Sequence, residues 1–354
     1  MVYFAKIIMS GKIKKMQTTS LFKEKIKKKS WQTNKNQFTF IDLFAGIGGF
    51  RIALESLGGK CVFSSEWEED SQEVYFKNFR EIPEGDIKKI NEKDVPQHNI
   101  LCAGFPCQAF SISGKRLGFK DTRGTLFFGI ARIVKHIQPE ILFLENVKNL
   151  TTHNKGKTIQ AVLNALNEIN YNYYFNVLRS SDYGVPQARE RVYIVAFRKD
   201  LNIKNFDFPK PIKDIKIVKD ILEKNEPIKD VYINRSDIKI TKKEENITNP
   251  RKPMQIGQIN NGGQGERIYS INAAGITLSA YGGGAASKTG AYLINGKIRK
   301  LTPRECARMQ GFPEDFELHP KANIAYKQLG NSVSVPVIKS IFKNMAKTCP
   351  EILS

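Results

Sequence analysis

Cys107 is a candidate nucleophile for attack on an electrophilic carbon. It follows the apolar run 100–103, which is typical of a buried strand, and the breaking residues Gly104 and Pro106 separate the two. In an open α/β sheet, the loops beyond the carboxyl ends of the strands form the ligand crevice. A thiolate on such a loop attacks carbon well when nearby groups lower its pKa. A cysteine can also simply end a turn, so the rest of the sequence must show whether Cys107 is a nucleophile.

A carboxylate and two arginines hold comparable positions further along the chain. Glu145 directly follows the apolar run 140–144, where loss of solvent would raise its pKa and let it act as an acid at neutral pH. We expect it at the same crevice rim as the cysteine. Arg189 and Arg191 alternate with other residues, so both should point to one face. Paired arginines usually form a salt-bridged surface, but these two lead into the buried run 192–197.

A glycine-rich turn opens the region expected to bind a ligand. Residues 38–44 are strand-like, and the sequence AGIGG then precedes an amphipathic segment. Its glycines, Gly46, Gly48 and Gly49, let the backbone approach a ligand at a helix N-terminus. The pattern is not the dinucleotide motif G-x-G-x-x-G, because Arg51 occupies the place of the third glycine. The turn alone is compatible with a ligand cradle or with an ordinary tight turn.

Two acids and a tryptophan follow at the spacing of a nucleoside site. Glu66 ends the apolar run 61–63, about 20 residues after the glycine turn, where a carboxylate can accept hydrogen bonds from ribose hydroxyls. Trp67 beside it could stack on a purine, and Asp86 follows a helix-like stretch. Each could be an ordinary surface group. As an ordered series they indicate an adenosine ligand across successive strand ends.

Basic and glycine-rich stretches surround these candidates. The loop 111–124 interleaves glycines with lysines and arginines, a composition that suits a mobile lid over a phosphate backbone. From residue 199 the composition shifts, and 257–290 is predicted to be a loop-built recognition surface and not a core. Thr302 and Glu305 then have the spacing of a helix N-cap and its capping partner.

Composition favours a polyanionic partner and disfavours several classes of protein. The 354 residues carry 56 Lys and Arg against 35 Asp and Glu, a net charge of +21, which favours nucleic acid. Five cysteines without C-x-x-C spacing and four scattered histidines indicate neither a disulfide framework nor a metal site. No apolar run approaches the ~20 residues needed to span a bilayer, and the N-terminus lacks a signal peptide. We expect a soluble cytoplasmic protein without a metal.

Six motifs in order give the sequence a family resemblance. They are DLFAGIGGF, GFPCQAFS, ENV, QARER, LTPRECARMQGFP and QLGNSV. In order and spacing they resemble the DNA cytosine-5 methyltransferases, and GGQGERIYS and ITLSAYGGG are similar to the bacterial GCGC-recognising, Hha-type members. The resemblance covers the chain from about residue 38 to its last helix. It implies a doubly wound α/β domain that binds S-adenosylmethionine, plus a smaller, glycine-rich target-recognition domain.

The resemblance implies a division of the chain and a set of catalytic residues. The segments are a basic, partly disordered arm (1–36), a catalytic and cofactor-binding domain (37–198), a target-recognition domain (199–298), and a C-terminal segment (299–354) whose helix returns to the catalytic domain. The implied catalytic residues are Cys107, Glu145, Arg189 and Arg191. The thiolate would add to C6 of a cytosine flipped out of the helix, an unstacking that costs about a few kcal/mol. The glutamate would hold N3 and the exocyclic amine, and Arg191 would bind O2 with support from Arg189.

Cofactor and DNA contacts are implied in the same way. S-adenosylmethionine, which leaves as S-adenosylhomocysteine, would contact Phe44, Gly46, Gly49, Glu66, Trp67, Asp86, Ile87, Pro106, Leu126 and Asn331. Glu66 would hold the ribose, Trp67 would stack on the adenine, and Asp86 would bond its amine. Duplex DNA would contact Ser111, Ser113, Lys115, Arg123, Gln264, Arg267, Thr277, Tyr281 and Gly284.

The DNA residues lead to a specific target, the inner cytosine of GCGC. Gln264 would fill the gap left by the flipped base, with Ser113 approaching from the other groove, and Thr277 would hold a phosphate. Arg267 can read guanine O6 and N7, a pair worth about 1–3 kcal/mol of discrimination. Alternatively it contacts only phosphate, and the same chemistry serves a different short target.

Other readings differ in what they require of the chain. An RNA-acting relative would lack the long region 199–298, and a non-catalytic DNA-binding relative would be expected to have lost Cys107 or Glu145. A dehydrogenase conflicts with the glycine pattern and with the absence of a histidine near it. We expect a bacterial enzyme, monomeric because one site per chain needs no dimer. A cognate restriction endonuclease acting on the same site without direct contact is a possible partner.

Overall fold

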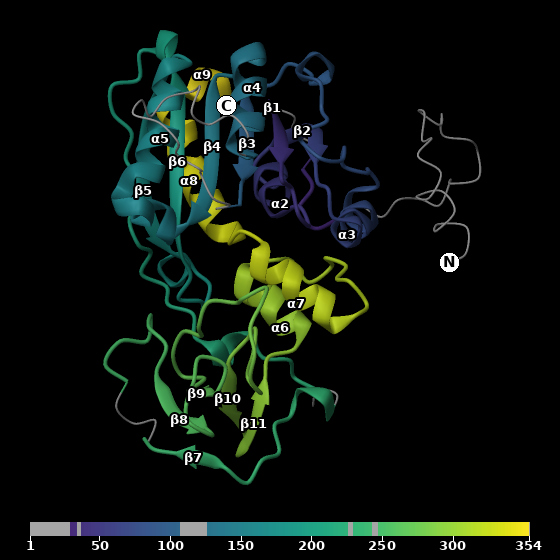
Figure 1. Ribbon diagram of the computed structural model, residues 1–354, viewed down its shortest axis with the longest axis vertical. Helices are drawn as coiled ribbons and strands as arrows, with labels where there is room; N and C mark the ends of the chain where they lie inside the picture. The colour runs from purple at the N-terminus through teal and green to yellow at the C-terminus, as the bar shows by residue number, and fades with distance from the viewer. Residues whose placement is uncertain (1–28, 34–36, 107–125, 226–228, 243–246, 354) are drawn as a thin grey trace, which may run out of the picture.

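The computed structural model describes residues 29–33, 37–106, 126–225, 229–242 and 247–353. Two sheets lie at opposite ends of the molecule, with α6 and α7 between them in the view of Figure 1. Most of the predicted basic arm falls outside these residues. Among the helices within these ranges, none has the length and apolar character needed to cross a bilayer.

The larger sheet brings the predicted site segments to one edge. Its strands are β1 (Phe38–Leu43), β2 (Gly59–Ser65), β3 (Ile100–Gly104), β4 (Ile141–Val147), β5 (Tyr171–Arg179) and β6 (Glu190–Arg198). They lie in the order β2-β1-β3-β4-β6-β5, in which β1 to β4 are parallel and β6 is antiparallel to both neighbours. The strand order therefore reverses at β1, which has β2 on one side and β3 on the other. In a doubly wound sheet, ligands bind in the crevice at the carboxyl ends of the strands where the order reverses, here β1 and β3.

The reversed direction of β6 explains how distant residues meet. Because β6 runs against β4, the start of β6 lies beside the end of β4, with Arg191 opposite Val147 and Tyr193 opposite Glu145. Arg189 and Arg191 precede or begin their strand, whereas Glu145 lies near the end of its own. All of them consequently reach the same sheet edge.

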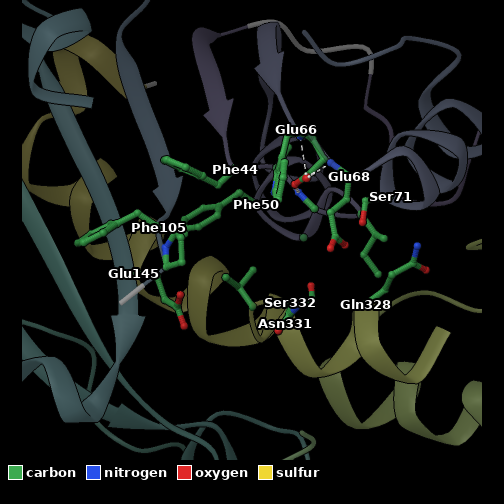
Figure 2. Close-up of a pocket in the computed structure, with 18 of the residues that line it drawn as sticks. Phe44, Phe50, Glu66, Glu68, Ser71, Phe105, Glu145, Gln328, Asn331 and Ser332 are labelled. Carbon is green, nitrogen blue, oxygen red and sulfur yellow. Dashed lines mark hydrogen bonds between the residues drawn. The ribbon is translucent and has the colours of Figure 1, made fainter. Parts of the chain in front are cut away.

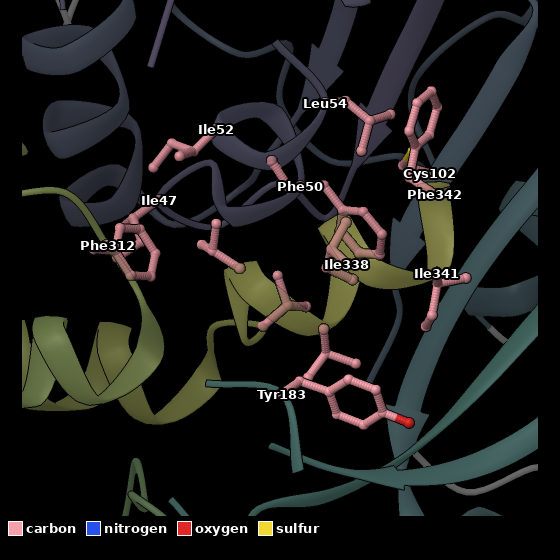
Figure 3. Close-up of a cluster of buried hydrophobic side chains, with 14 of the residues drawn as sticks. Ile47, Phe50, Ile52, Leu54, Cys102, Tyr183, Phe312, Ile338, Ile341 and Phe342 are labelled. Atoms are coloured by element: carbon pink, nitrogen blue, oxygen red, sulfur yellow. The ribbon is translucent and has the colours of Figure 1, made fainter. Parts of the chain in front are cut away.

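Helices cover both faces of this sheet. The elements are α2 (Gly49–Glu55), α3 (Glu69–Phe79), α4 (Leu126–Ile137), α5 (Lys157–Glu168), α8 (Val335–Thr348) and α9 (Pro350–Leu353). One buried cluster contains residues of α4 and α5, and the other contains residues of α2 and α8. In Figure 3, Ile338, Ile341 and Phe342 of α8 lie in the second cluster with Phe50 of α2. The last part of the chain thus covers its first strand.

The smaller sheet has a core of its own. Its strands are β7 (Ile238–Ile240), β8 (Gln255–Ile259), β9 (Arg267–Tyr269), β10 (Ala291–Ile294) and β11 (Lys297–Lys300), in the order β11-β10-β9-β8-β7. Ile256, Ile259, Ile268 and Ala286 are buried against one another. The expectation that 257–290 forms no core is therefore wrong, because sparse isoleucines and alanines between the glycines are enough to pack one face of a short sheet.

Two helices connect the sheets, α6 (Pro303–Gln310) and α7 (Ala322–Asn331). The predicted N-cap of α6 is confirmed, since Thr302 Oγ1 accepts the Glu305 backbone N–H at 3.2 Å and Glu305 Oε2 accepts that of Thr302 at 2.8 Å. Arg299 of β11 donates to both Glu305 oxygens at 2.8 and 2.7 Å. A buried ion pair thereby joins the smaller sheet to α6.

Within the described ranges, single turns of 3₁₀ helix span Glu92–Asp94, Lys148–Thr151, Ser180–Asp182, Lys199–Leu201, Val218–Ile221 and Lys229–Val231. Residues His153–Gly156 form a kinked turn in which Asn154 and Lys155 have positive φ.

Residues 29–33, which we name the N-terminal clasp, join the chain's beginning to the segment between α6 and α7. Trp31 is 5% exposed and its ring contacts Phe79 and Phe316, with centroids 5.9 and 6.0 Å away. The Ser30 backbone N–H and hydroxyl both donate to Asp315 at 2.7 Å. A segment expected to belong to a disordered arm is therefore ordered here, because a single large apolar side chain anchors it.

Candidate active site

A pocket of about 520 Å³ opens at the carboxyl edge of the larger sheet. Its walls come from the segments that follow β1, β2, β3 and β4, from the start of β6 and from the end of α7 (Figure 2). This volume lies in the range of ligand sites, about 300–1,000 Å³. All ten residues predicted to contact the cofactor line this pocket: Phe44, Gly46, Gly49, Glu66, Trp67, Asp86, Ile87, Pro106, Leu126 and Asn331.

The turn after β1 has a backbone that few side chains tolerate. Gly46 and Gly48 have φ of 56° and 87°, and a Cβ on Gly48 would overlap the ring of Phe79. Arg51, at the place of the third glycine, points away from the pocket into a buried network. It donates to Glu55 at 2.7 Å and to Glu81 at 2.5 and 3.1 Å. Arg51 therefore stabilises the turn from the side opposite the pocket.

Glu66 receives its hydrogen bonds from backbone groups. Its Oε2 accepts the Gly46 N–H at 2.8 Å, and its Oε1 accepts the N–H groups of Trp67 and Glu68 at 2.8 Å. Burial raises the pKa of this carboxyl, and the three backbone donors oppose that rise. A carboxylate has about four lone-pair positions, so acceptor capacity remains for a hydroxyl in the pocket. Trp67 beside it is 71% exposed and offers a free aromatic face.

The second acid of the predicted series lies on a short turn at the same wall. Asp86 Oδ1 accepts the Lys88 N–H at 3.0 Å, and the neighbouring Ile87 is buried against Gly129 of α4. This contact fixes the turn against the helix that begins at Leu126.

Glu145 lies across the pocket from Glu66 and Glu68 (Figure 2). It is 7% exposed, and its Oε1 lies 3.2 Å from Arg191 Nε. Burial raises the pKa of Glu145, as predicted, while the two nearby arginines, Arg191 and then Arg189, oppose the rise. Within the described ranges this contact lacks hydrogen-bond geometry, so Oε1 is ion-paired but makes no hydrogen bond. A buried carboxyl that lines a pocket and has hydrogen-bonding capacity left is suited to hold a polar ligand or a proton.

Asn146 is a residue of this site that sequence reasoning missed. Its Nδ2 donates to the Phe105 carbonyl at 2.8 Å, and its Oδ1 accepts the Val147 N–H at 2.8 Å. The side chain thereby ties the end of β4 to the segment that follows β3, directly before Pro106. The ENV motif contained the signal, since an asparagine buried at a strand end requires partners.

Several predicted residues lie outside the described ranges. These are Cys107, Ser111, Ser113, Lys115 and Arg123. The described ranges end before this segment at Pro106 and resume after it at Leu126, and both of these residues line the pocket.

The remaining predicted DNA residues lie on two loops of the smaller sheet. Gln264 is exposed on the turn between β8 and β9, Arg267 is the exposed first residue of β9, and Tyr281 and Gly284 belong to the loop before β10. The loops touch backbone to backbone, since the Ala286 N–H donates to the Gly265 carbonyl at 2.8 Å and a Cβ on either Gly265 or Gly284 would overlap the other loop.

Tyr281 and Thr277, two of the predicted DNA residues, lie between β9 and β10. Tyr281 is 72% exposed and contributes to the pocket lining. Thr277 is half-buried, and its hydroxyl donates to the Ala188 carbonyl at 3.0 Å.

The family model for C-5 cytosine-specific DNA methylases matches residues 38–347. The chain belongs to this family. It is 55% identical over 309 residues to the type II methyltransferase M.HhaI of Haemophilus parahaemolyticus, covering 87% of this chain and 94% of the relative. The corresponding values for M.HpaII of Haemophilus parainfluenzae are 42% identity over 333 residues, with 88% and 90% covered. The chain is therefore a DNA cytosine-5 methyltransferase that uses S-adenosylmethionine.

Solved structures of the same fold extend beyond close relatives. The S. pombe Dnmt2 methyltransferase has a TM-score of 0.65 at 18% identity, covering 89% of this chain and 99% of that one. The Entamoeba histolytica methyltransferase EhMeth has a TM-score of 0.67 at 20% identity, covering 90% and 99%. These similarities agree with the predicted α/β methyltransferase fold.

Further pocket residues of this methyltransferase were not predicted. They include Phe50, Glu68, Ser71, Phe105, Gln328, Ser332 and Val333. Gln328, Ser332 and Val333 belong to the QLGNSV motif, and that motif was the available signal.

A histidine and two acids outside the pocket have donor types that can bind metal. The ligand atoms of Asp70, Glu73 and His319 all lie within 4.8 Å of one another. His319 Nδ1 accepts the Lys321 N–H at 3.0 Å, so a neutral ring carries its proton on Nε2. Nε2 lies 3.9 and 3.8 Å from the two carboxylates. In this tautomer Nε2 has no lone pair for a metal, and the cluster is better described as a link between α3 and the segment before α7.

Proposed function

We propose that this methyltransferase modifies C5 of the inner cytosine of GCGC in duplex DNA, using Cys107 as its nucleophile and Glu145 with Arg191 to hold the flipped base. The observation that carries the catalytic part is the Glu145–Arg191 pair, at 3.2 Å, in the pocket that Pro106 also lines. Cys107 directly follows that proline in the sequence. The target sequence is supported by the 55% identity to M.HhaI and by the GGQGERIYS and ITLSAYGGG segments.

The pocket fits S-adenosylmethionine. Glu66 has acceptor capacity for ribose hydroxyls, the exposed ring of Trp67 offers a stacking face, and Asp86 Oδ2 is available to an adenine amine. The glycine turn and the end of α7 at Asn331 would enclose the amino-acid part. When bound, the cofactor supplies an electrophilic methyl group.

Cys107 and Glu145 would activate the base together. Cytosine C5 is a poor nucleophile, and addition of the Cys107 thiolate to C6 gives it enamine character. The carbon–sulfur bond places negative charge on the ring toward N3. A protonated Glu145 would neutralise that charge by donating to N3 while its other oxygen accepts from the exocyclic amine. Arg191 would bind O2, and Arg189 would support it. Once C5 carries the methyl group, a base removes the C5 proton, the carbon–sulfur bond breaks, and the thiolate is restored.

Replacement of the nucleophile tests this chemistry. We expect Cys107→Ser to lose methyl transfer while keeping DNA and cofactor binding. A duplex with 5-fluorocytosine at the target should trap the parent enzyme covalently, because fluorine cannot leave C5 as a proton does. Mass spectrometry of the trapped complex locates the attached residue. Normal turnover by Cys107→Ser would overturn the assignment.

Arg267 and Gln264 are proposed to carry sequence recognition. Arg267 lies exposed at the start of β9, where its Nε donates to the Gly262 carbonyl at 3.2 Å and its side chain also contacts Tyr269, and its terminal nitrogens would bind guanine. Gln264 would occupy the space of the flipped base, and Thr277, Tyr281 and Gly284 would line the duplex.

Sequence context is measured by bisulfite sequencing of DNA from cells expressing the enzyme. Methylation at the inner cytosine of GCGC is expected, and methylation in another context would refute the target while leaving the chemistry intact. Arg267→Ala should lose discrimination for guanine more than it loses general affinity. A uniform loss across sequences would instead assign this arginine to a phosphate.

The predicted loop 111–124 and the assembly complete the proposal. Ser111, Lys115 and Arg123 would contact the DNA backbone, and Ser113 would approach the gap opposite Gln264. The segments 37–198, 199–298 and 299–354 would act as catalytic domain, target-recognition domain and returning C-terminal segment, with 1–36 as a basic arm. We expect a monomer in the bacterial cytoplasm, paired with a restriction endonuclease that cuts the same sequence without binding the methyltransferase.

A further inference from the structure

Arg189 is the largest of the fully buried side chains in the described ranges. It is 2% exposed, and no carboxylate within those ranges lies at ion-pair distance from it. Burial, reinforced by the like charge of Arg191 and opposed by the charge of Glu145, lowers the pKa of Arg189 to about 9. Burial of a cation without an anion at ion-pair distance is expensive, so the hydrogen bonds that it makes should have a function.

These hydrogen bonds reach two segments that are far apart in the sequence. Nη1 donates to the Leu278 carbonyl at 3.3 Å. Nη2 donates to the Gly330 carbonyl at 3.1 Å and to the Ser332 carbonyl at 2.7 Å. Gly330 and Ser332 flank Asn331 in the pocket wall, so one nitrogen holds the backbone on both sides of that residue.

The Leu278 peptide is held from its other side as well. Gln187 Oε1 accepts the Leu278 N–H at 3.0 Å, while its Nε2 donates to the Met309 carbonyl at 3.1 Å. The Thr277 hydroxyl donates to the carbonyl of Ala188, the residue between Gln187 and Arg189. The Ala188 N–H also donates to the Gly275 carbonyl at 2.9 Å, and the Gly275 N–H donates to the Pro186 carbonyl at 2.8 Å. Residues 186–189 and 275–278 are therefore joined by backbone and side-chain hydrogen bonds.

The recognition segment also touches the pocket wall directly. A Cβ on Gly330 would overlap the backbone of Ser279 and Ala280, so these two stretches are in contact without an intervening side chain. Arg189 and this backbone contact join residues 277–281 directly to residues 330–332. A displacement of 277–281 on contact with DNA would therefore move the pocket wall at 330–332.

We propose that Arg189 is a positioning residue that couples DNA binding at 277–281 to cofactor binding at 330–332. This rests on the proposed function, which assigns those two segments to the two ligands. Coupling between sites is reciprocal, so each ligand must change the affinity for the other by the same factor.

The experiment measures that factor with S-adenosylhomocysteine and a GCGC duplex. Calorimetry gives the Kd of S-adenosylhomocysteine with and without saturating duplex, and fluorescence anisotropy gives the Kd of the duplex with and without S-adenosylhomocysteine. For the parent we expect a factor of about 5–150, the usual range of allosteric coupling. In Arg189→Lys the factor should fall toward one, since one ammonium cannot serve carbonyls in two directions.

Matched variants separate coupling from simple loss of binding. Glu66→Ala should weaken S-adenosylhomocysteine binding, and Arg267→Ala should weaken duplex binding, but both should retain the parent's factor. Gln187→Met removes the hydrogen bond to the Leu278 peptide without removing a charge, so it should also lower the coupling factor. This variant replaces Arg189→Lys if Arg189→Lys does not fold. A parent factor of one, or a parental factor in both Arg189→Lys and Gln187→Met, would overturn the proposal. Failure of the parent to bind the GCGC duplex would instead overturn the proposed target.

Discussion

The two tryptophans of this chain allow structural and binding contributions to be separated with one type of substitution. Trp31 is 5% exposed in the N-terminal clasp, and Trp67 is 71% exposed at the pocket. We expect Trp31→Ala to lower stability and leave the pocket unchanged. Trp67→Ala should leave stability unchanged and weaken S-adenosylmethionine binding. Each variant is therefore the control for the other.

The loss of stability expected for Trp31→Ala follows from the burial of this side chain. A buried aromatic side chain removes about 150–250 Å² from water, which at about 25 cal/mol per Å² corresponds to roughly 4–6 kcal/mol. Measured truncations of this kind cost about 3–5 kcal/mol. The clasp is a short segment, and Trp31 contacts few elements, so we expect the lower end, about 3 kcal/mol. At about 2 °C per kcal/mol for a large domain, Tm should fall by about 6 °C.

Urea unfolding and calorimetry measure the two effects, and fluorescence adds an independent readout. The emission of Trp67→Ala arises from Trp31 alone and should be blue-shifted and protected from acrylamide. The emission of Trp31→Ala arises from Trp67 and should be red-shifted and change on cofactor addition. Loss of cofactor affinity in Trp67→Ala should be about 1–1.5 kcal/mol for one aromatic contact. A Tm of Trp31→Ala within 1 °C of the parent would refute the docked clasp, and a large fall in Trp67→Ala would refute the division of roles.

Three further predictions concern buried polar groups near the pocket. Glu66→Ala should weaken S-adenosylmethionine binding by about 1–3 kcal/mol through loss of a charged acceptor, and unchanged affinity by calorimetry would contradict the ribose assignment. Asn146→Ala should lower kcat with little change in KM for DNA, because the segment before the nucleophile loses its tie to β4, and a pure KM effect in steady-state kinetics would contradict this. Burial raises the pKa of Asp42 from 3.8 to about 8, so folding takes up a proton between these values and stability falls as pH rises through them. Asp42→Asn should remove about 1.4 kcal/mol per pH unit of that slope, and parallel stability curves from urea unfolding at pH 5 to 8 would show that this carboxyl is not the source.

The parts of the fold that the sequence predicts well are those determined by local pattern. The apolar runs predicted five of the six strands of the larger sheet to within a few residues, although β5 was not predicted, and Thr302 with Glu305 predicted the start of α6. Position at a strand end also predicted the raised pKa of Glu145. The strands and the helix start depend on neighbours a few residues away, which a sequence displays directly, whereas the burial of Glu145 was inferred from its position at the end of an apolar strand.

Features that depend on long-range packing were missed or only implied. Asn146 acts through a carbonyl 41 residues away, and the role of Arg51 as a buried ion-pair partner appears only once Glu81 lies beside it. The small core of Ile256 and Ile268 needed the strand pairing to become visible. Burial of a polar side chain is decided by the whole fold, so its partners cannot be read from local spacing.

The packing of α8 against the start of the chain has a consequence for synthesis. Phe38 of β1 stacks on Phe342 of α8 with ring centroids 4.8 Å apart, although about 300 residues separate them. At roughly 5–20 residues per second, a ribosome needs about 15–60 s to make the helix after it has made the strand. During that interval one face of the larger sheet stays uncovered, and contacts of such high sequence separation form slowly. Nascent chains halted before residue 335 should therefore bind chaperones and resist release in a folded state, and the enzyme should acquire its cofactor pocket only after its last helix leaves the exit tunnel.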